Sequence, residues 1–171
     1  SRTIRTLAEC FPHGDWLGET CGIAQKDDIS GELTISLDLL SLCDTGLDAQ
    51  LDSRVPICAD EANCKQIFDA RLSSLGFSVE SEMHPAHHTP AEGEFVSTLL
   101  RCYETYSGRK GECVATGGGT YVHEIPGGVA FGAGMPGFVS NMHGANERIN
   151  IRDSLAACKI FALAIAELCG E

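Results

Sequence analysis

His143 and Glu147 are candidates for binding a metal ion. They stand four positions apart in the segment Met142-His143-Gly144-Ala145-Asn146-Glu147. A neutral imidazole is well suited to zinc. By itself this is a weak signal, because an isolated histidine is more often a surface residue or a hydrogen-bonded core residue than a metal ligand.

A second candidate is the glycine-rich segment Gly117-Gly118-Gly119-Thr120-Tyr121. Consecutive glycines allow backbone conformations that other residues cannot adopt, so a substrate can approach main-chain N–H groups there. The alternative is a tight turn between two strands. Without further context the segment favours that alternative.

Arg54 is the third candidate, within Asp52-Ser53-Arg54-Val55-Pro56. A guanidinium can hold a carboxylate through two parallel hydrogen bonds. The alternative is a solvated arginine on a strand face, paired with Asp52 or Asp48. Spacing alone supports the two interpretations about equally.

Together, the segments 117–121, 128–132 and 142–147 resemble the last third of the PepV-type dinuclear zinc dipeptidases, which belong to the aminoacylase and carboxypeptidase-like metallopeptidases. The resemblance spans nearly the whole chain and is most specific from 112 to 149. It implies that His143 is the last metal ligand of a site with two zinc ions and that Glu147 supports this ligand. It also implies that Gly118, Gly119 and Thr120 line the substrate pocket and that Arg54, on the lid, clamps the substrate.

The same resemblance implies that the site is incomplete in these residues. The family's upstream ligands, a His-x-Asp, an Asp, a Glu-Glu pair and another Asp, have no counterpart here. We therefore expect the C-terminal part of a cytoplasmic zinc dipeptidase that cleaves dipeptides or short peptides. By itself this part would be inactive and would bind no zinc tightly, and its partner would be the missing catalytic half or a second copy. The alternative is a non-catalytic dimerisation or interaction module derived from the family.

Hydrophobic periodicity predicts the helices and strands of the first half of the chain, which position Arg54. Apolar alternation predicts strands at 33–39 and 47–57, joined as a hairpin by Asp44-Thr45-Gly46. A helix follows, with Asp60 as its N-cap and Gly76 as its stop. A third strand is expected at 77–83, and a short helix near 4–11. This order matches part of a ferredoxin-like sandwich.

The second half begins after two prolines within 84–90, which mark a crossing between domains. The histidines of that segment, His84, His87 and His88, could bind adventitious metal, but a solvated linker is favoured. We predict a helix at 94–106, short buried strands at 113–116 and 129–132, and a final helix at 153–168.

The final helix is apolar nearly all round and expects cover on more than one side. Residues 90–171 therefore suggest a piece of a larger α/β unit, because a two-stranded sheet is marginal alone. With the resemblance, the expected fold class is α/β (α+β). Residues 1–88 would be a partial ferredoxin-like lid domain, and 89–171 the C-terminal lobe of an α/β zinc-peptidase catalytic domain.

Composition excludes several other functions. The 171 residues carry a formal charge of −12, which disfavours nucleic acid and anionic membranes as partners. The nine cysteines are odd in number and contain no C-x-x-C pair, so we expect reduced, mostly buried thiols and no structural zinc knot. No apolar run near 20 residues and no signal-peptide pattern occur, which favours a cytoplasmic protein.

Overall fold

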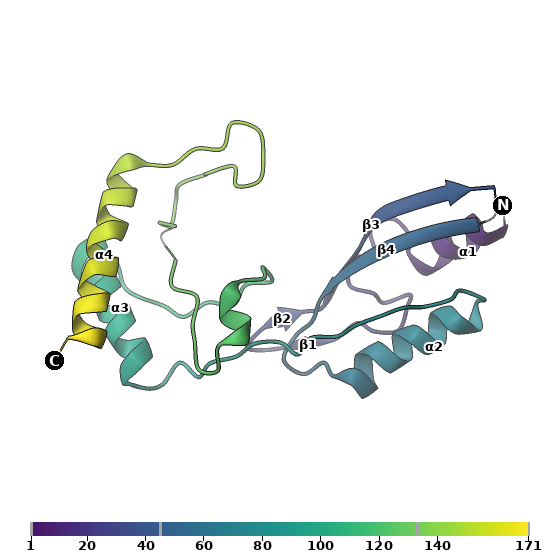
Figure 1. Cartoon of the computed structure of the whole chain (residues 1–171), viewed down its shortest axis with the longest axis horizontal. Helices are drawn as coiled ribbons and strands as arrows, with labels where there is room; N and C mark the ends of the chain where they lie inside the picture. Colours follow the sequence, from purple (N-terminus) through teal and green to yellow (C-terminus); the bar gives the residue numbers. More distant parts are fainter. Residues whose placement is uncertain (1, 45, 133, 171) are drawn as a thin grey trace. The chain divides into compact units, whose positions relative to one another are not determined.

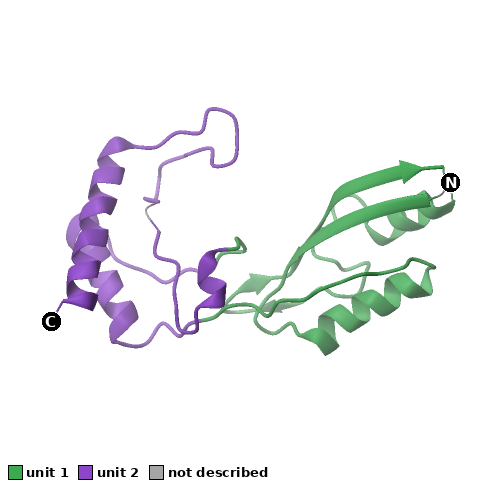
Figure 2. Cartoon of the chain, viewed as in Figure 1, with its two compact units in different colours: residues 1–88, 115–119 green, residues 89–114, 120–171 purple. Residues whose placement is uncertain are grey.

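The computed structural model describes residues 2–44, 46–132 and 134–170 (Figure 1). Four α-helices and two antiparallel pairs of strands make this part of the chain a mixed α+β structure. The chain divides into two compact units (Figure 2). Unit 1 comprises residues 1–88 and 115–119, and unit 2 comprises residues 89–114 and 120–171.

Unit 1 begins with helix α1 (Arg2–Cys10) and the short antiparallel strands β1 (Lys26–Asp27) and β2 (Gly31–Glu32). Asp27 organises the turn between these strands, since its carboxylate accepts hydrogen bonds from the N–H of Ile29 (2.8 Å) and of Ser30 (2.6 Å). The Ser30 hydroxyl also donates to Asp27, and these bonds from Ser30 hold the pKa of Asp27 well below its usual value. A polar network thus fixes this turn.

The predicted hairpin is confirmed. Strands β3 (Thr34–Cys43) and β4 (Gly46–Arg54) pair antiparallel, with Thr34 opposite Arg54 and an irregularity between Leu37 and Leu39. Thr45, in the expected turn, lies outside the described residues. Towards that turn the leucines 39, 40 and 42 are exposed, so the hairpin buries apolar side chains mainly near its base.

The predicted helix after the hairpin is also confirmed. Asp60 caps it, because its carboxylate accepts from the N–H of Asn63 (2.7 Å) while the Asn63 side chain accepts from the N–H of Asp60 (2.8 Å). The first turn is a π-helix, η1 (Glu61–Lys65), which continues as α2 (Gln66–Ser74). Gly76 follows with φ 91°, as expected of a helix stop. The buried core beside this helix comprises Cys10, Cys21, Ile23, Leu33, Ile35, Ala59, Cys64 and Leu72.

The predicted third strand at 77–83 is wrong. This segment has no strand partner among the described residues, although Phe77, Val79 and Met83 pack against the core of unit 1. Alternating burial of side chains against a core requires only an extended backbone, whereas a strand also requires a neighbour for its hydrogen bonds. The periodicity therefore predicted the burial correctly but not the pairing.

Unit 2 is built on helices α3 (Glu94–Ser107) and α4 (Ile151–Cys169), which pack together. Both helices were predicted, and Gly108 ends α3 with φ 65°. Leu99 and Cys102 from α3 meet Ile160 and Ala164 from α4 in the core. A short 3-10 helix that the sequence did not predict, η2 (Tyr121–Glu124), precedes the long loop that leads to α4.

The two short strands predicted at 113–116 and 129–132 are wrong. Residues 113–116 are exposed and form neither a helix nor a strand, with Val114 86% exposed. In 129–132, Val129 and Phe131 pack against the helix pair, and the Phe131 ring meets Phe161 edge-on at 5.6 Å. An apolar run between glycines thus marks contact with the helices here, not membership of a sheet.

Helix α4 buries one face only. Ala157, Ile160 and Ala164 are buried, whereas Leu155 and Ile165 are 61% and 63% exposed. The described residues therefore do not provide the cover on more than one side that the sequence of this helix leads us to expect.

The expectation that the cysteines are mostly buried is wrong. Four of the nine are buried (Cys10, Cys21, Cys64 and Cys102) and five are exposed (Cys43, Cys58, Cys113, Cys158 and Cys169), so the thiols are not mostly buried. The exposed ones lie in loops, at the end of β3 and on the outer side or end of α4. Burial raises the pKa of the Cys21 thiol to about 11, which makes it a poor nucleophile. Among the described residues, none of the helices has the length and apolar character needed to cross a bilayer.

Candidate functional site

Arg54 and the glycine segment, far apart in the sequence, lie together in unit 1. A Cβ atom added at Gly117 would stand 3.8 Å from Cβ and Cγ of Arg54, and one added at Gly119 would stand 3.5 Å from Arg54 Nη1. The segment therefore lies beside the arginine side chain, and a methyl group added at Gly117 or Gly119 would just touch it. Gly118, between these two glycines, donates its N–H to the Thr116 hydroxyl at 3.3 Å.

Arg54 is also paired with Asp52, as the alternative interpretation of the sequence expected. Arg54 Nη2 stands 2.8 Å from Asp52 Oδ2, and the two side chains are 51% and 49% exposed. Exposed ion pairs of this kind contribute only about 0–1 kcal/mol. A carboxylate from a ligand could therefore replace Asp52 on the guanidinium at little cost. The arrangement is able to hold a carboxylate next to a flexible glycine backbone.

Thr120 belongs to unit 2, where it caps η2. Its hydroxyl accepts from the N–H of Val122 at 3.3 Å, and its carbonyl accepts from the N–H of His123 at 3.2 Å. Its backbone is extended, with φ −139°. The role of Thr120 in this structure is thus to begin a helical turn directly after the glycine segment.

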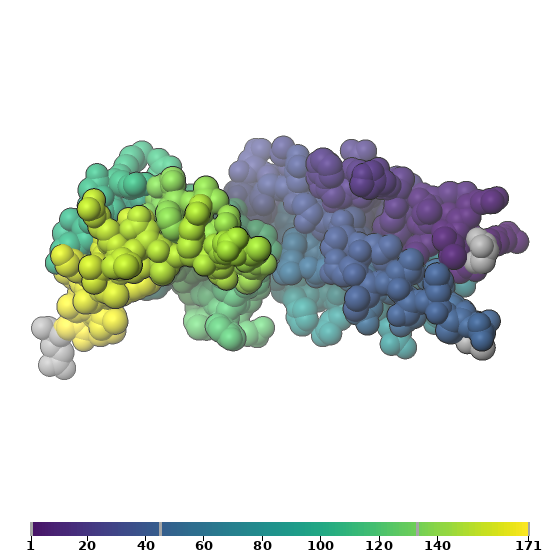
Figure 3. Space-filling view, turned by 90° about the horizontal axis from the view of Figure 1, so that it is seen from above, coloured from purple at the N-terminus to yellow at the C-terminus, as the bar shows by residue number. Residues whose placement is uncertain are grey.

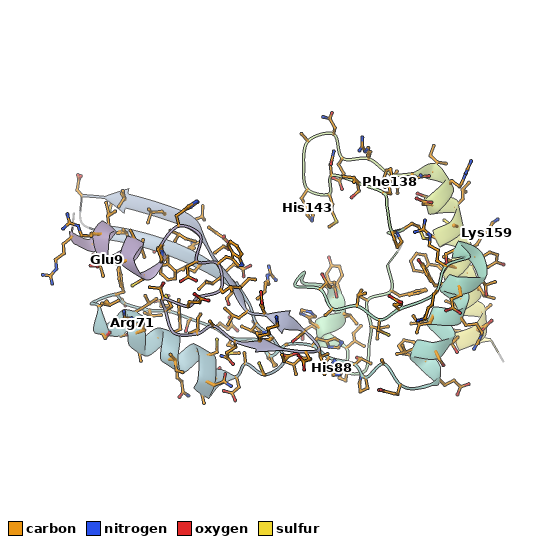
Figure 4. All side chains as sticks on the ribbon, turned by 180° about the vertical axis from the view of Figure 1, so that it is seen from behind. Glu9, Arg71, His88, Phe138, His143 and Lys159 are labelled. Atoms are coloured by element: carbon orange, nitrogen blue, oxygen red, sulfur yellow. The ribbon has the colours of Figure 1, made fainter. Side chains whose placement is uncertain are left out.

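His143 lies in the loop between η2 and α4. The N–H of Gly144 donates to the carbonyl of Asn141 at 2.8 Å, which closes a turn with His143 at its third position and φ 62°. Figure 4 shows His143 at the end of the loop farther from α4, and in Figure 3 the yellow-green atoms of this loop lie at the surface of unit 2. A metal ion could therefore reach the imidazole.

The backbone of this loop is unusual. Asn141, His143 and Asn146 have φ of 54°, 62° and 57°, a left-handed conformation that is uncommon outside glycine. Such residues cost about 1–3 kcal/mol each and cluster at functional sites. A Cβ added at Gly144 would stand 3.1 Å from the Asn141 carbonyl oxygen, so the turn is also tight. The loop thus holds His143 in a conformation that its neighbours must stabilise.

Glu147 is not joined to His143. Within the residues that the structure describes, no hydrogen bond or ion pair links the two side chains, and both are exposed. The left-handed residue Asn146 bends the chain between them. A supporting role of Glu147 stays a prediction.

The residues present do not make a complete zinc site. In 2–44, 46–132 and 134–170, no three His, Cys, Asp or Glu side chains are gathered so that they could hold a metal ion. A catalytic zinc needs about three protein ligands. His143 has the chemistry of one such ligand and is accessible, but the described residues do not gather two further ligands around it.

Arg148 is a residue that sequence reasoning missed. Its Nε donates to the Val139 carbonyl at 3.0 Å, its backbone N–H donates to the Ser140 carbonyl at 2.9 Å, and its guanidinium carbon lies 6.0 Å from the centre of the Phe138 ring. No spacing rule for helices or strands indicates such contacts, because they depend on how the loop turns back on itself.

No family model matches the chain. The chain is 34% identical over 169 residues to YtjP of Bacillus subtilis (strain 168), a protein assigned to the dipeptidases, and the match covers 98% of this chain and 36% of YtjP. It is also 34% identical to the Beta-Ala-Xaa dipeptidase of Lactobacillus delbrueckii subsp. lactis, over 96% of this chain and 35% of that enzyme. A third relative, the assigned dipeptidase SH1171 of Staphylococcus haemolyticus, is 29% identical over 100% of this chain and 37% of its own length.

These relatives are all dipeptidases by name. The chain spans about a third of their length. It is therefore homologous to about a third of the PepV-like dipeptidases, and the resemblance seen in its motifs is confirmed.

Proposed function

We propose that the chain contributes substrate-binding residues and one metal ligand to a zinc metallopeptidase that hydrolyses dipeptides or short peptides. The observation that carries this proposal is that the glycine segment 117–119 lies beside Arg54, in a chain homologous to dipeptidases. A guanidinium beside accessible backbone is what recognition of a peptide's C-terminal carboxylate requires. This hydrolase would act in the cytoplasm.

Each candidate residue has a role in this proposal. Arg54 holds the C-terminal carboxylate of the substrate, and Gly118, Gly119 and Thr120 line the pocket for its backbone. His143 holds one of two zinc ions of the complete enzyme, and Glu147 supports it. The accessible imidazole and the left-handed backbone of His143 support this assignment.

The two units take the roles of lid and lobe. Unit 1, with a hairpin followed by a helix, is the partial ferredoxin-like lid domain, and unit 2 is the C-terminal lobe of the catalytic domain. The burial of α4 on one face supports the second assignment, because its exposed apolar residues suit a larger α/β unit.

A chimera tests the proposal. The 171 residues replace the matched stretch of the Lactobacillus delbrueckii Beta-Ala-Xaa dipeptidase, and hydrolysis of a β-alanyl dipeptide is measured together with the zinc content of the purified protein. We expect turnover in the chimera, and the loss of one zinc ion and of nearly all turnover in its His143→Ala variant, because two zinc ions act as a unit.

The control is a chimera with Glu9→Ala, a substitution in α1, which should keep both zinc ions and full turnover. A folded chimera that retains activity and both zinc ions after His143→Ala overturns the metal-ligand assignment. A folded chimera with neither zinc nor turnover favours the second candidate, a non-catalytic interaction module. The exposed apolar residues of α4 are the observation that favours that candidate.

A further inference from the structure

We propose that Arg148 is the positioning residue that fixes the loop carrying His143. This inference rests on the proposed role of His143 as a metal ligand, and it concerns the backbone geometry on which that role depends. Arg148 does not need to touch the metal ion or the substrate, because it acts through the conformation of the loop.

The contacts of Arg148 join the two ends of the loop. Residues 138–140 lead into the turn at His143, and Arg148 follows it in the chain. Arg148 contacts each residue of 138–140 in a different way: its guanidinium lies over the Phe138 ring, its Nε donates to Val139, and its backbone N–H donates to Ser140. One residue thereby closes the segment that contains Asn141, His143 and Asn146.

Other support for the loop is weak. Residues 141–149 are all exposed and contain no helix or strand, so neither a packed core nor a hydrogen-bond ladder holds them. Within the loop, the Asn141 side chain donates to the Ala145 carbonyl over 3.4 Å, which is long for a hydrogen bond. Three left-handed residues in such a segment require a tie between its ends, since an unrestrained chain relaxes to negative φ.

The side chain of Arg148 provides what its backbone cannot. The bond from the N–H of Arg148 to Ser140 can be made by any residue except proline, so by itself it does not depend on arginine. The Nε bond and the ring contact do depend on it, because a planar guanidinium can lie over an aromatic ring while its Nε–H points to a carbonyl. Lysine can keep the charge near the ring but has no Nε–H donor at that position.

Nuclear magnetic resonance of the full chain tests this inference. A residue with positive φ gives a strong intraresidue nuclear Overhauser effect between its amide proton and Hα, because these protons lie close together. We expect a strong effect at His143 in the unmodified chain and in Arg152→Ala, which removes the same charge from the first turn of α4. In Arg148→Ala the effect should weaken several-fold, and the backbone order parameter of His143 should fall below about 0.6, the range of flexible backbone.

Arg148→Lys provides the graded comparison. The nuclear Overhauser effect and the order parameter of His143 in this variant should lie between those of the unmodified chain and those of Arg148→Ala, because lysine keeps the charge and loses the Nε bond. Amide shifts of α3 and α4 should stay unchanged in all variants, which separates a local effect from unfolding. If Arg148→Ala leaves both the effect and the order parameter of His143 as they are, the inference is wrong.

The result is separable from the proposed function. The resonance experiment concerns the loop backbone and involves no metal ion, whereas the chimera measures zinc content and turnover. Should the loop loosen in Arg148→Ala while His143→Ala leaves the chimera active, the positioning role stands and the metal-ligand role fails. If instead the loop stays unchanged in Arg148→Ala while His143→Ala inactivates the chimera, the metal-ligand role of His143 stands and the positioning role of Arg148 fails.

Discussion

At the scale of single residues, the structure gives Arg54 two neighbours with different consequences. The Asp52 carboxylate neutralises the guanidinium, and the glycine segment leaves room beside it. Pairing with Asp52 and binding of a ligand are not exclusive, because an exposed ion pair is weak enough to exchange its carboxylate for that of a ligand. If Arg54 binds the substrate carboxylate, as proposed, Asp52 occupies that place on the guanidinium when no peptide is bound.

This arrangement makes a prediction for Arg54→Lys in the chimera. We expect kcat/KM for a dipeptide to fall about 10-fold to 100-fold, because a hydrogen bond to a charged group contributes about 1.5–3 kcal/mol and lysine loses the two-pronged geometry. Steady-state kinetics with a dipeptide and with its C-terminal amide provide the measurement. The amide should be a poor substrate for both proteins and should show a much smaller difference between them.

Equal kcat/KM values for the two proteins with the dipeptide would remove Arg54 from substrate binding. The solvated-arginine interpretation would then stand. Arg101→Lys serves as the matched control, since Arg101 pairs with Glu167 between α3 and α4, within unit 2.

The sequence indicated His143 and Arg54 as candidates from their types and local motifs, and their roles stay predictions. It also anticipated Asp52 as a neighbour of Arg54, which the structure confirms. The closeness of Arg54 to the glycine segment was not anticipated, nor were the contacts of Arg148 with residues 138–140. Both depend on where the chain returns after a long loop, which neither periodicity nor capping rules encode.

At the scale of helices and strands, local sequence signals predicted where helices begin and end, but they did not predict which segments pair as strands. Asp60, Gly76 and Gly108 act through bonds or backbone angles within a few residues, so their roles could be inferred from the sequence. The strands expected at 77–83, 113–116 and 129–132 do not form among the described residues, because a strand needs a partner that no local pattern specifies. The hairpin succeeded because its partner is adjacent in sequence.

The start of α4 is also fixed by bonds within a few residues, and it yields a second prediction. Asn150 caps this helix, since its side-chain oxygen accepts from the N–H of Arg152 (3.0 Å) and of Asp153 (3.3 Å). Asn150→Ala should lower the free energy of unfolding by about 1 kcal/mol, the usual cost of losing an N-cap. Urea denaturation followed by circular dichroism at 222 nm measures it.

Asn150→Ser is the control, because serine is about as good an N-cap as asparagine and should restore most of the loss. If alanine and serine reduce stability equally, the cap does not contribute through its hydrogen bonds.

At the scale of the whole molecule, a high negative charge coexists with exposed apolar side chains. The formal charge is −12, while α4 exposes Ile151 (76%), Leu155 (61%) and Ile165 (63%). Exposed apolar patches of more than a few hundred Å² usually mark an interface. Repulsion between like-charged copies opposes such an association, and salt screens this repulsion.

We therefore predict that the chain alone self-associates, and that it does so more strongly at about 0.5 M salt, where the Debye length is only a few Å. Light scattering at several concentrations provides the measurement. Leu155→Ser should weaken the association. Ile29→Ser should not, although Ile29 is equally exposed at 61%, because it lies in the β1–β2 turn of unit 1.

A chain that stays monomeric at high concentration and high salt, and that binds no hydrophobic dye, contradicts this prediction. An association that Ile29→Ser weakens as much as Leu155→Ser does would show that the face of α4 is not its location.

Unit 1 takes up residues 115–119 from within the stretch that otherwise forms unit 2. Neither unit is therefore encoded by one uninterrupted run of codons. A gene segment that ends after His88 would express the hairpin and α2 but would omit the glycines that lie against Arg54. Recombination at that boundary would separate the arginine from its neighbours, so natural or engineered exchange of this region must carry both units as one inherited block.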